Sequence, residues 1–423
     1  GNELLDAFAG LWCVNVGYGQ QSVVDAASAQ MAKLAYATGY FHFGSAPAAQ
    51  LAEKLVSIAP RSLQHVYFSL GGSDAVDAAL RFITHYCNVT GRPQKKHFIS
   101  LERGYHGSSS IGAGLTAIAS FHRGFDVPLP TQHYLPSPYA YRDPLGRDGQ
   151  ALIAASVAAL EAKVAELGGS DHVAAFFCEP IQGSGGVIVP PVGWLKAMRD
   201  ACRRLDILFV ADEVITGFGR TGPMFACEAE NVEPDMMTIA KGLTAGYAPM
   251  GAVLMSDAIY QAIADGEQGQ VVGHGQTYSA HPVSAAVALE VIRLYEDGLI
   301  ANGQAVAHAF GAGLDSLLDH PLVGDSRHRG LLGALELVAD KTSKARFDPS
   351  LRLADKISAA AYRNGVIFRA FADNILGFAP ALCFTEHDVA LMVERVRATL
   401  DEVLADDAVS AARRAASGAR KAA

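Results

Sequence analysis

At 423 residues the chain is too long to be built around one small core, so two or three domains are expected. Half of the residues are hydrophobic and 18% are charged, which is typical of a well-packed globular protein and excludes a largely disordered chain. The net charge of -9 argues against a nucleic acid or an anionic membrane as partner.

The cysteines indicate a reducing compartment. None of the six forms a C-x-x-C pair, and Cys178 ends an apolar run, so we expect buried free thiols in a cytoplasmic protein and no bound metal. No signal peptide and no membrane-spanning run is visible. Because the first residue is Gly1 and not methionine, we expect that a further segment precedes it.

In chain order, a first helix is expected at residues 23–34, and short apolar strands then alternate with amphipathic helices. Strands are expected at residues 65–69, 97–100, 172–178, 207–211, 236–240 and 251–255. Helices are expected between them at residues 73–87, 151–167 and 193–205, and a long loop at residues 131–150. This alternation predicts an α/β fold with a mainly parallel sheet.

From about residue 302 the pattern changes to helices with a few antiparallel-looking strands, such as residues 330–338 and 366–370. We therefore predict two domains. A large domain would span residues 35–300, and a smaller α+β domain would be built from both termini, residues 1–34 and 301–423. The tail after Val409 is expected to be a frayed surface helix.

Four segments place polar groups where a predicted strand ends, which is the edge where open α/β sheets bind ligands. The first reads Gly-Gly-Ser-Asp at residues 71–74. Glycine lets backbone N–H groups approach a ligand, the start of a helix favours a phosphate, and Ser73 beside Gly72 adds a hydroxyl. Alternatively, Ser73 only caps the helix and Asp74 complements its dipole. The sequence lacks the G-x-x-x-x-G-K-[ST] pattern of a nucleotide P-loop.

The second segment is an apolar strand that delivers Asp212 to its end. A buried carboxylate is costly unless it is paired or hydrogen-bonded, and a protonated pyridine nitrogen would be a suitable partner. The alternative is a carboxylate that caps the next turn.

In the third segment Lys241 follows the apolar residues 236–240. A lysine in a dry pocket near other cations can present a free amine that attacks an aldehyde, whereas the alternative is an ordinary surface lysine.

In the fourth segment, Tyr105 and His106 lie between two glycines. A flat aromatic ring there could stack on a heterocycle, but core packing explains it equally well.

Residues 217–222 match G-x-G-x-x-G, the pattern of dinucleotide-binding sites. Such a fingerprint opens a helix and is followed by a second strand that ends in an acid. Here Pro223 follows the glycines, no helical period is present, and the acid Asp212 comes first. These features argue against a nicotinamide or flavin site.

Taken together, these segments resemble the class III pyridoxal-phosphate aminotransferases from Leu11 to about Leu400. The most specific stretch is residues 212–222 (DEVITGFGRTG), followed by Ala240-Lys241-Gly242. It is supported by the stretches EPIQGSGG, GYHG and TYSAHP at residues 179–186, 104–107 and 277–282. The resemblance implies a fold-type-I architecture, pyridoxal 5'-phosphate as cofactor, and a homodimer or a dimer of dimers with shared active sites.

The resemblance also implies roles for single residues. Lys241 would hold the cofactor as a Schiff base, and Asp212 would pair with the pyridine nitrogen. Tyr105 and Val214 would enclose the ring, with His106 beside them.

Further roles concern the phosphate and the ring's surroundings. Gly72 and Ser73 would hold the phosphate, and Thr277 would reach the phosphate in the neighbouring subunit. Glu179 would be a strand-end acid near the ring.

Residues 10–19 are similar to the opening of ω-transaminases that use pyruvate, in which Trp12 would line the substrate pocket with Tyr105. Residues 368–373 resemble the mobile-arginine segment of these enzymes. Arg369 would clamp a substrate carboxylate and swing away for a carboxylate-free amine; the alternative is a surface salt bridge.

The sequence departs from the family at two points. The phosphate turn usually reads Ser-Gly-Ser-Glu, whereas here it is Gly-Gly-Ser-Asp, and Ala280 replaces a glycine before His281. Neither change removes a catalytic group.

We therefore expect a ping-pong transamination from an amine or ω-amino acid to an α-keto acid such as pyruvate. A decarboxylase or an aminomutase of the same fold is an alternative, and an NAD-dependent oxidoreductase would rest on residues 217–222 alone.

Overall fold

The computed structural model describes residues 2–40, 42–146, 148–266 and 272–422. The chain divides into two compact units. Unit 1 comprises Gly1–Gly17, Gly219–Gly222 and Gly298–Ala423, and unit 2 comprises Tyr18–Phe218 and Pro223–Asp297. None of the described helices is both long and apolar enough to cross a membrane.

A seven-stranded sheet organises the described part of unit 2. Strand β8 is antiparallel to both of its neighbours, and the other neighbouring pairs are parallel. Most strands therefore end at the same edge of the sheet. In spatial order the strands are β2 (His65–Ser69), β8 (Gly251–Met255), β7 (Met236–Ile239), β6 (Leu208–Asp212), β5 (Val173–Cys178), β3 (His97–Leu101) and β4 (Gln132–Leu135).

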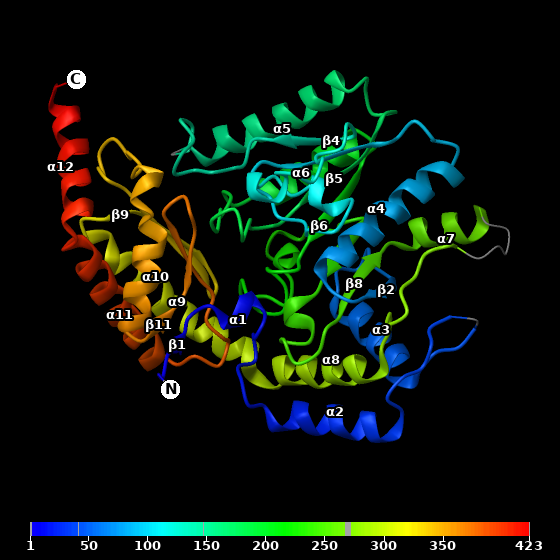
Figure 1. The fold of residues 1–423 in the computed structure, drawn as a ribbon. Coiled ribbons are helices and arrows are strands. Elements are labelled where there is room, and N and C mark those ends of the chain that lie inside the picture. Colours follow the sequence, from blue (N-terminus) through cyan, green and yellow to red (C-terminus); the bar gives the residue numbers. More distant parts are fainter. Residues whose placement is uncertain (1, 41, 147, 267–271, 423) are drawn as a thin grey trace. The chain divides into compact units, whose positions relative to one another are not determined.

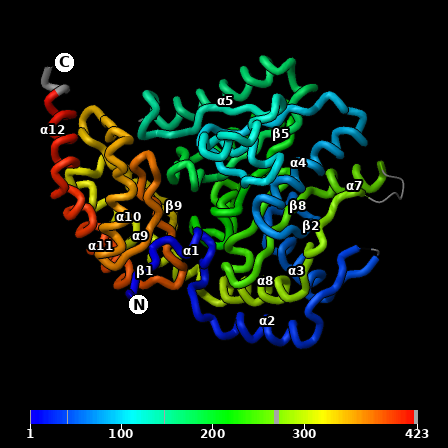
Figure 2. Tube along the Cα trace, in the orientation of Figure 1, coloured from blue at the N-terminus to red at the C-terminus, as the bar shows by residue number. Residues whose placement is uncertain are grey.

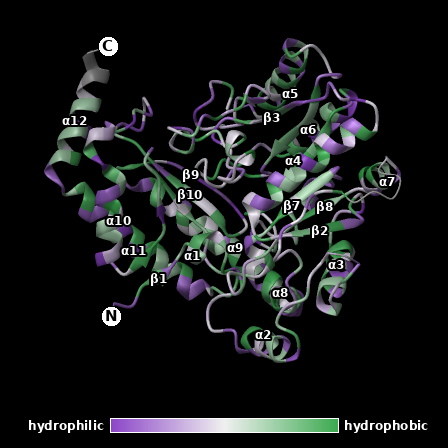
Figure 3. Ribbon diagram, turned by 45° about the vertical axis from the view of Figure 1, so that its right-hand side comes forward, coloured by the Kyte–Doolittle hydropathy of each residue, from purple (hydrophilic) through white to green (hydrophobic). Residues whose placement is uncertain are grey.

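Helices α4, α5 and α6 pack against strands of this sheet (Figure 1). Helix α4 buries one side at a helical period, including Val76, Ala79 and Ile83, against inner strands such as β5, all of whose residues are buried. Polar and apolar residues alternate along these helices in the hydropathy colours of Figure 3. The helices of unit 2 are α2 (Gln21–Lys33), α3 (Ala46–Ile58), α4 (Gly72–Val89), α5 (Gly149–Glu166), α6 (Trp194–Arg204), α7 (Asp257–Gly266) and α8 (Pro282–Leu294).

Short 3-10 turns and one π-helical segment connect these elements. The 3-10 turns are Gly112–Gly114, Ala119–Phe121, Ala226–Glu230 and Lys241–Leu243 in unit 2, and Leu317–Asp319 and Pro349–Leu351 in unit 1; the π-helical segment is Tyr295–Leu299.

Unit 1 is a smaller α+β assembly. Its β1 (Leu5–Asp6) pairs in parallel with β11 (Val366–Ile367), so the N-terminal strand lies beside a strand from the C-terminal part of the chain within this unit (Figure 2). A four-stranded antiparallel sheet has the order β12 (Arg369–Ala370), β13 (Ile375–Phe378), β10 (Leu332–Leu337) and β9 (Val323–Arg329). The helices are α1 (Ala9–Trp12), α9 (Ile300–Ser316), α10 (Leu353–Arg363), α11 (Glu386–Leu404) and α12 (Asp407–Ala422).

The six strands and three helices predicted for the middle of the chain are confirmed to within two residues at each end. Residues 131–150 are not a continuous loop, because β4 forms there as the parallel neighbour of β3. The helix expected for the tail is present as part of α12, which extends to Ala422.

The expected boundaries of the small domain were wrong at residues 18–34. This segment belongs to unit 2, because α2 packs along α8 and because the N–H of Gln20 donates to the hydroxyl of Tyr247 at 2.9 Å. A short piece from the middle of the chain, Gly219–Gly222, belongs to unit 1 instead.

Candidate active site

Asp212 is the last residue of β6, and its side chain is hydrogen-bonded to His106. The distance between Asp212 Oδ2 and His106 Nδ1 is 2.8 Å, and both side chains are buried. Burial opposes a charge on His106, but the bond to Asp212 and the carboxylate's charge outweigh it and raise the pKa of this imidazole. His106 therefore keeps the proton that it donates to Asp212.

The turn that carries Tyr105 and His106 is held by two side chains. Glu179, directly after β5, accepts from the N–H of Tyr105 at 2.9 Å and from the N–H of Gly183 at 2.8 Å. The hydroxyl of Thr116 accepts from the N–H of His106 at 2.8 Å. Burial, with a further contribution from the charge of Asp212, raises the pKa of Glu179 to about 7. Sequence reasoning missed Thr116, which no motif marks.

The Gly-Gly-Ser-Asp turn lies at the start of α4. Gly71 is the N-cap and no side chain caps the helix, so Ser73 is not the N-cap. The hydroxyl of Ser73 instead accepts from the N–H of Ser108 at 3.2 Å. A Cβ on Gly72 would lie 2.9 Å from Val214 Cγ1, so only glycine fits here without a shift. The first N–H groups of this helix are thus available to an anion.

Lys241 begins a 3-10 turn two residues after β7 ends. Its φ of 35° lies in the left-handed region, which is strained for a residue with a side chain and is typical of functional positions. The buried hydroxyl of Tyr295 donates to the carbonyl of the next residue, Gly242, at 2.6 Å and fixes this turn. Tyr295 was not predicted from the sequence.

The ends of β6 and β7 bring these groups to one edge of the sheet. Asp212 pairs with Thr238 across the two strands, and Thr238 lies three residues before Lys241. The N–H of Val214 donates to Asp212 Oδ1 at 3.1 Å. Because Gly72 approaches both Val214 and Ala240, the start of α4 adjoins the same place.

Tyr105 and Thr277 also belong to unit 2. The half-buried ring of Tyr105 contacts the ring of Phe121 edge-on, with centroids 5.2 Å apart, and burial raises the pKa of its phenol. Thr277 is exposed, and its carbonyl accepts from the hydroxyl of Tyr36 at 2.9 Å.

Trp12 and Arg369 both lie in unit 1 and are brought together by Phe371. The Trp12 and Phe371 rings meet edge-on with centroids 6.3 Å apart. The guanidinium of Arg369 lies over the Phe371 ring, 5.5 Å from its centroid. Phe371 was not singled out from the sequence.

The G-x-G-x-x-G segment has a structural role. Arg220, fully buried, donates to the carbonyl of Leu331 at 3.1 Å and to the side-chain oxygen of Asn15 at 2.7 Å. A Cβ on Gly219 would lie 2.7 Å from Ile300 Cγ1. No helix follows these glycines, which explains why they are no dinucleotide fingerprint.

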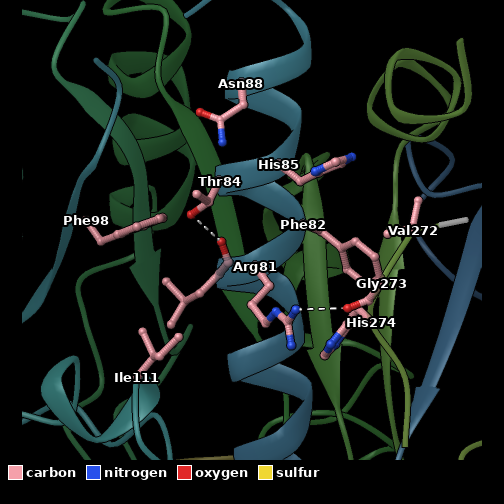
Figure 4. Close-up of a pocket in the computed structure, with 11 residues that line it drawn as sticks. Arg81, Phe82, Thr84, His85, Asn88, Phe98, Ile111, Val272, Gly273 and His274 are labelled. Carbon is pink, nitrogen blue, oxygen red and sulfur yellow. Dashed lines mark hydrogen bonds between the residues drawn. The ribbon is translucent and has the colours of Figure 1, made fainter. Parts of the chain in front are cut away.

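A cavity of about 380 Å³ lies along α4, and Figure 4 shows residues that line it. Arg81 donates to the carbonyl of Gly273 there at 3.1 Å, and Thr84 donates to that of Leu80 at 2.9 Å. Among the described residues that line this cavity there is none of the predicted site residues and no pairing of an amine with a carboxylate for the expected chemistry.

The residues at the sheet edge fit pyridoxal phosphate. The uncapped start of α4 suits its phosphate, the Asp212 carboxylate suits its ring nitrogen, and the Lys241 amine suits its aldehyde. The buried hydroxyl of Thr238 has no hydrogen-bond partner among the described residues. An unsatisfied buried hydroxyl beside Asp212 is expected where a polar group of a ligand binds.

Comparison with known proteins gives the family. The sequence matches the family Aminotransferase class-III over residues 1–400. It is 41% identical over 408 residues to the putrescine–pyruvate aminotransferase of Pseudomonas aeruginosa, covering 96% of this chain and 88% of that protein. It is 38% identical over 414 residues to the diaminobutyrate–2-oxoglutarate transaminase of Halomonas elongata, covering 95% and 87%.

Solved structures agree with the sequence relatives. The (S)-enantioselective omega-transaminase of Thermomicrobium roseum matches with a TM-score of 0.93 at 37% identity, covering 96% of this chain and 90% of that one. The chain belongs to the class III aminotransferases, a family of pyridoxal-phosphate enzymes of fold type I.

Proposed function

We propose that this aminotransferase moves an amino group from an amine or ω-amino acid to pyruvate by a ping-pong mechanism, with pyridoxal 5'-phosphate as its cofactor. One observation carries the proposal. The Asp212–His106 pair, the uncapped start of α4 and the strained Lys241 turn all lie at one edge of the unit 2 sheet.

Several residues would hold the cofactor at this edge. Gly72 and Ser73 would bind its phosphate, Asp212 its ring nitrogen and Lys241 its aldehyde carbon. Tyr105 and Val214 would enclose its ring. When bound, the cofactor supplies an electron sink for the negative charge that develops on the substrate carbon.

Lys241 carries the proton transfer. With a donor amine bound, the Lys241 amine would take the proton from the substrate carbon as a base and would give a proton back as an acid. In the second half-reaction the same amine moves protons in the opposite direction toward the keto acid. Asp212, oriented by its hydrogen bond to His106, would supply the negative charge that pairs with the ring nitrogen.

Glu179 acts on this site through the backbone. Its carboxylate fixes the N–H groups of Tyr105 and Gly183, so the turn that carries Tyr105 and His106 keeps its position.

Replacement of Lys241 by alanine tests the assignment. We expect Lys241→Ala to abolish alanine formation from an amine and pyruvate, and to lose the absorbance of the covalently held cofactor. Lys196→Ala, on the surface of α6, is the control and should behave like the wild type. A Lys241→Ala protein that remains active and yellow would contradict the proposal.

Relatives guide the choice of donors. One relative is named for putrescine and pyruvate, another for diaminobutyrate and 2-oxoglutarate, and others for γ-aminobutyrate. A panel of diamines, ω-amino acids and aryl-alkyl amines should be tested with pyruvate and with 2-oxoglutarate, and the amino acid product measured. Release of CO2, or an isomerised amine without a keto-acid requirement, would instead identify a decarboxylase or an aminomutase.

We also propose a homodimer in which Thr277 of the partner subunit completes each phosphate site. Tyr36, Tyr40, Phe43 and Tyr278 are all exposed, and the Tyr36 and Tyr278 rings meet with centroids 6.1 Å apart. Exposed aromatic side chains of this kind are typical of a protein interface. Thr277 adjoins them through the hydroxyl of Tyr36.

Light scattering tests the dimer. Tyr278→Glu should give a monomer with weakened cofactor binding, because a charge in an apolar interface is costly. Val192→Glu is the control, since Val192 is also an exposed hydrophobic residue but lies elsewhere in the chain. A Tyr278→Glu dimer with unchanged cofactor affinity would contradict this arrangement.

A further inference from the structure

A small cavity lies in unit 2 at the edge of the sheet opposite Asp212 and Lys241. Its volume is about 160 Å³. Its lining includes Ala174, Leu208 and Asp235, which lie at or next to the starts of β5, β6 and β7, and residues near the ends of α4 and α6. These three strands are parallel, so their first residues share one edge of the sheet and their last residues share the other. The cavity is therefore separate from the candidate active site.

The charged side chains around this cavity are mostly cationic. Four cations and two carboxylates line it: Arg92, Lys95, Arg199, Arg203, Asp206 and Asp235. The cavity thus has an excess of two positive formal charges, although the whole chain has a net charge of -9. A concave surface that is dominated by one sign of charge concentrates ions of the opposite sign.

Lys95 supplies a buried positive charge that is only weakly compensated. Its side chain is 3% exposed, and its ammonium donates to the backbone carbonyl of Asp206 and lies 3.3 Å from Asp206 Oδ2. The same carboxylate oxygen lies 3.5 Å from Arg92 Nη1. Because the Asp206 side chain is 75% exposed, water screens its charge and makes it a weak partner for both cations. A buried ammonium is costly unless an anion offsets its charge, so a second anion would stabilise this place.

Arg203 brings hydrogen-bond donors that the protein does not use. Arg203 is exposed on α6, and within the described part of the chain its guanidinium makes no hydrogen bond and no ion pair. Arg199, one turn earlier, is instead held by Asp235 at 2.8 Å. A guanidinium presents two parallel N–H groups that match the oxygens of a phosphate.

We propose that this cavity binds one phosphate dianion, free or as the head group of a phosphomonoester, between Arg203, Arg92 and Lys95. A cavity of this size equals the share of liquid volume of about five water molecules, so it holds a phosphate group but not a whole nucleotide. In the absence of the anion, the Asp206 carboxylate takes its place beside Arg92 and Lys95. Being exposed, this carboxylate can turn into solvent when the anion binds. The site does not depend on the proposed transamination.

Calorimetric titration of the holoenzyme with inorganic phosphate tests the proposal. The bound cofactor then fills the phosphate site at the start of α4, and potassium chloride keeps the ionic strength constant. We expect one phosphate to bind per chain, and Arg203→Gln to weaken its binding at least about tenfold, because a hydrogen bond to a charged group is lost. Arg204→Gln is the matched control, since Arg204 is the next residue on α6 but pairs with Glu161 at 2.9 Å. Its affinity should equal that of the wild type.

A variant that gains affinity complements this loss. Asp206→Asn removes the competing carboxylate from Arg92 and Lys95, so phosphate should bind about two- to fivefold more tightly. Titration with glycerol 3-phosphate separates the two sources of the ligand, because tighter binding than inorganic phosphate identifies a phosphomonoester.

Three results would overturn the inference. They are a wild type that binds neither ligand, equal affinities for Arg203→Gln and Arg204→Gln, and weaker binding to Asp206→Asn. Each would mean that these cations only neutralise the C-terminal ends of α4 and α6.

Discussion

Glu179 shows how one buried residue connects the site to pH. Its carboxyl is buried beside Asp212, which raises its pKa from 4.5 to about 7. The folded protein therefore holds a proton that the unfolded chain has lost between these two values. Stability falls as pH rises through this window and is constant above it.

Glu179→Gln should remove this pH dependence. For a shift of this size the wild type should lose about 3 kcal/mol of unfolding free energy between pH 4.5 and 7.5 that the variant does not lose. Urea unfolding of the cofactor-free proteins at the two pH values measures the difference. Glu166→Gln is the control, because Glu166 is a surface carboxylate whose pKa is lowered by Lys163. Parallel pH profiles for the wild type and Glu179→Gln would show that Glu179 ionises normally.

The His106–Asp212 pair gives a second prediction for single residues. His106→Phe keeps a flat ring but removes the side-chain donor of the buried Asp212 carboxylate, and loss of one partner of a buried charged pair costs about 3–5 kcal/mol. We expect a lower melting temperature without cofactor and weaker cofactor binding. His97→Phe, which breaks a half-exposed His97–His133 contact instead, should have a much smaller effect. Similar melting temperatures for the two variants would mean that the Asp212 bond is not important for stability.

At the scale of elements, local sequence pattern predicted strands well where both faces are buried. Strand β5 is apolar throughout and was found, whereas β9 (VGDSRHR) has no alternating apolar pattern and was missed. Its position comes from pairing with β10 rather than from its own side chains. For the same reason the sequence marked Asp212, which ends an apolar strand, and Lys241, which closely follows one, but did not mark Thr116 or Tyr295, which come from other segments of the chain.

The N-terminus of helix α4 can pack against Val214 because residue 72 is a glycine. Gly72→Ala should lower stability by about 1–3 kcal/mol, because the new methyl group meets Val214 in a packed place. Gly71→Ala should not, since open space surrounds its Cβ and its backbone is extended. Thermal melting of both cofactor-free variants makes the comparison. The double variant Gly72→Ala, Val214→Ala should recover most of the loss, and a failure to recover would place the clash elsewhere.

At the scale of the whole molecule, the chain passes four times between the two units, and a glycine with positive φ stands at each passage. Their φ angles are 81°, 79°, 117° and 127° at Gly17, Gly219, Gly222 and Gly298. The sequence could not reveal this, because the partition between units depends on contacts that no local pattern encodes. Two of these glycines, Gly219 and Gly222, belong to the segment that resembles a dinucleotide fingerprint.

Gly298→Ala tests whether the folded protein requires a positive φ where the chain passes from one unit to the other. No atom lies within 4 Å of a Cβ at this position, so a methyl group meets no steric obstacle and only the backbone conformation opposes it. Holding a residue with a side chain at such a φ costs about 1–3 kcal/mol. Gly44→Ala is the matched control, because its Cβ also lies in open space but its φ is not positive. There the loss of freedom in the unfolded chain should stabilise the protein by about 0.4–1 kcal/mol. Urea unfolding should therefore move in opposite directions for the two variants. A shift in the same direction would mean that the passage at Gly298 relaxes to a conformation that any residue can adopt.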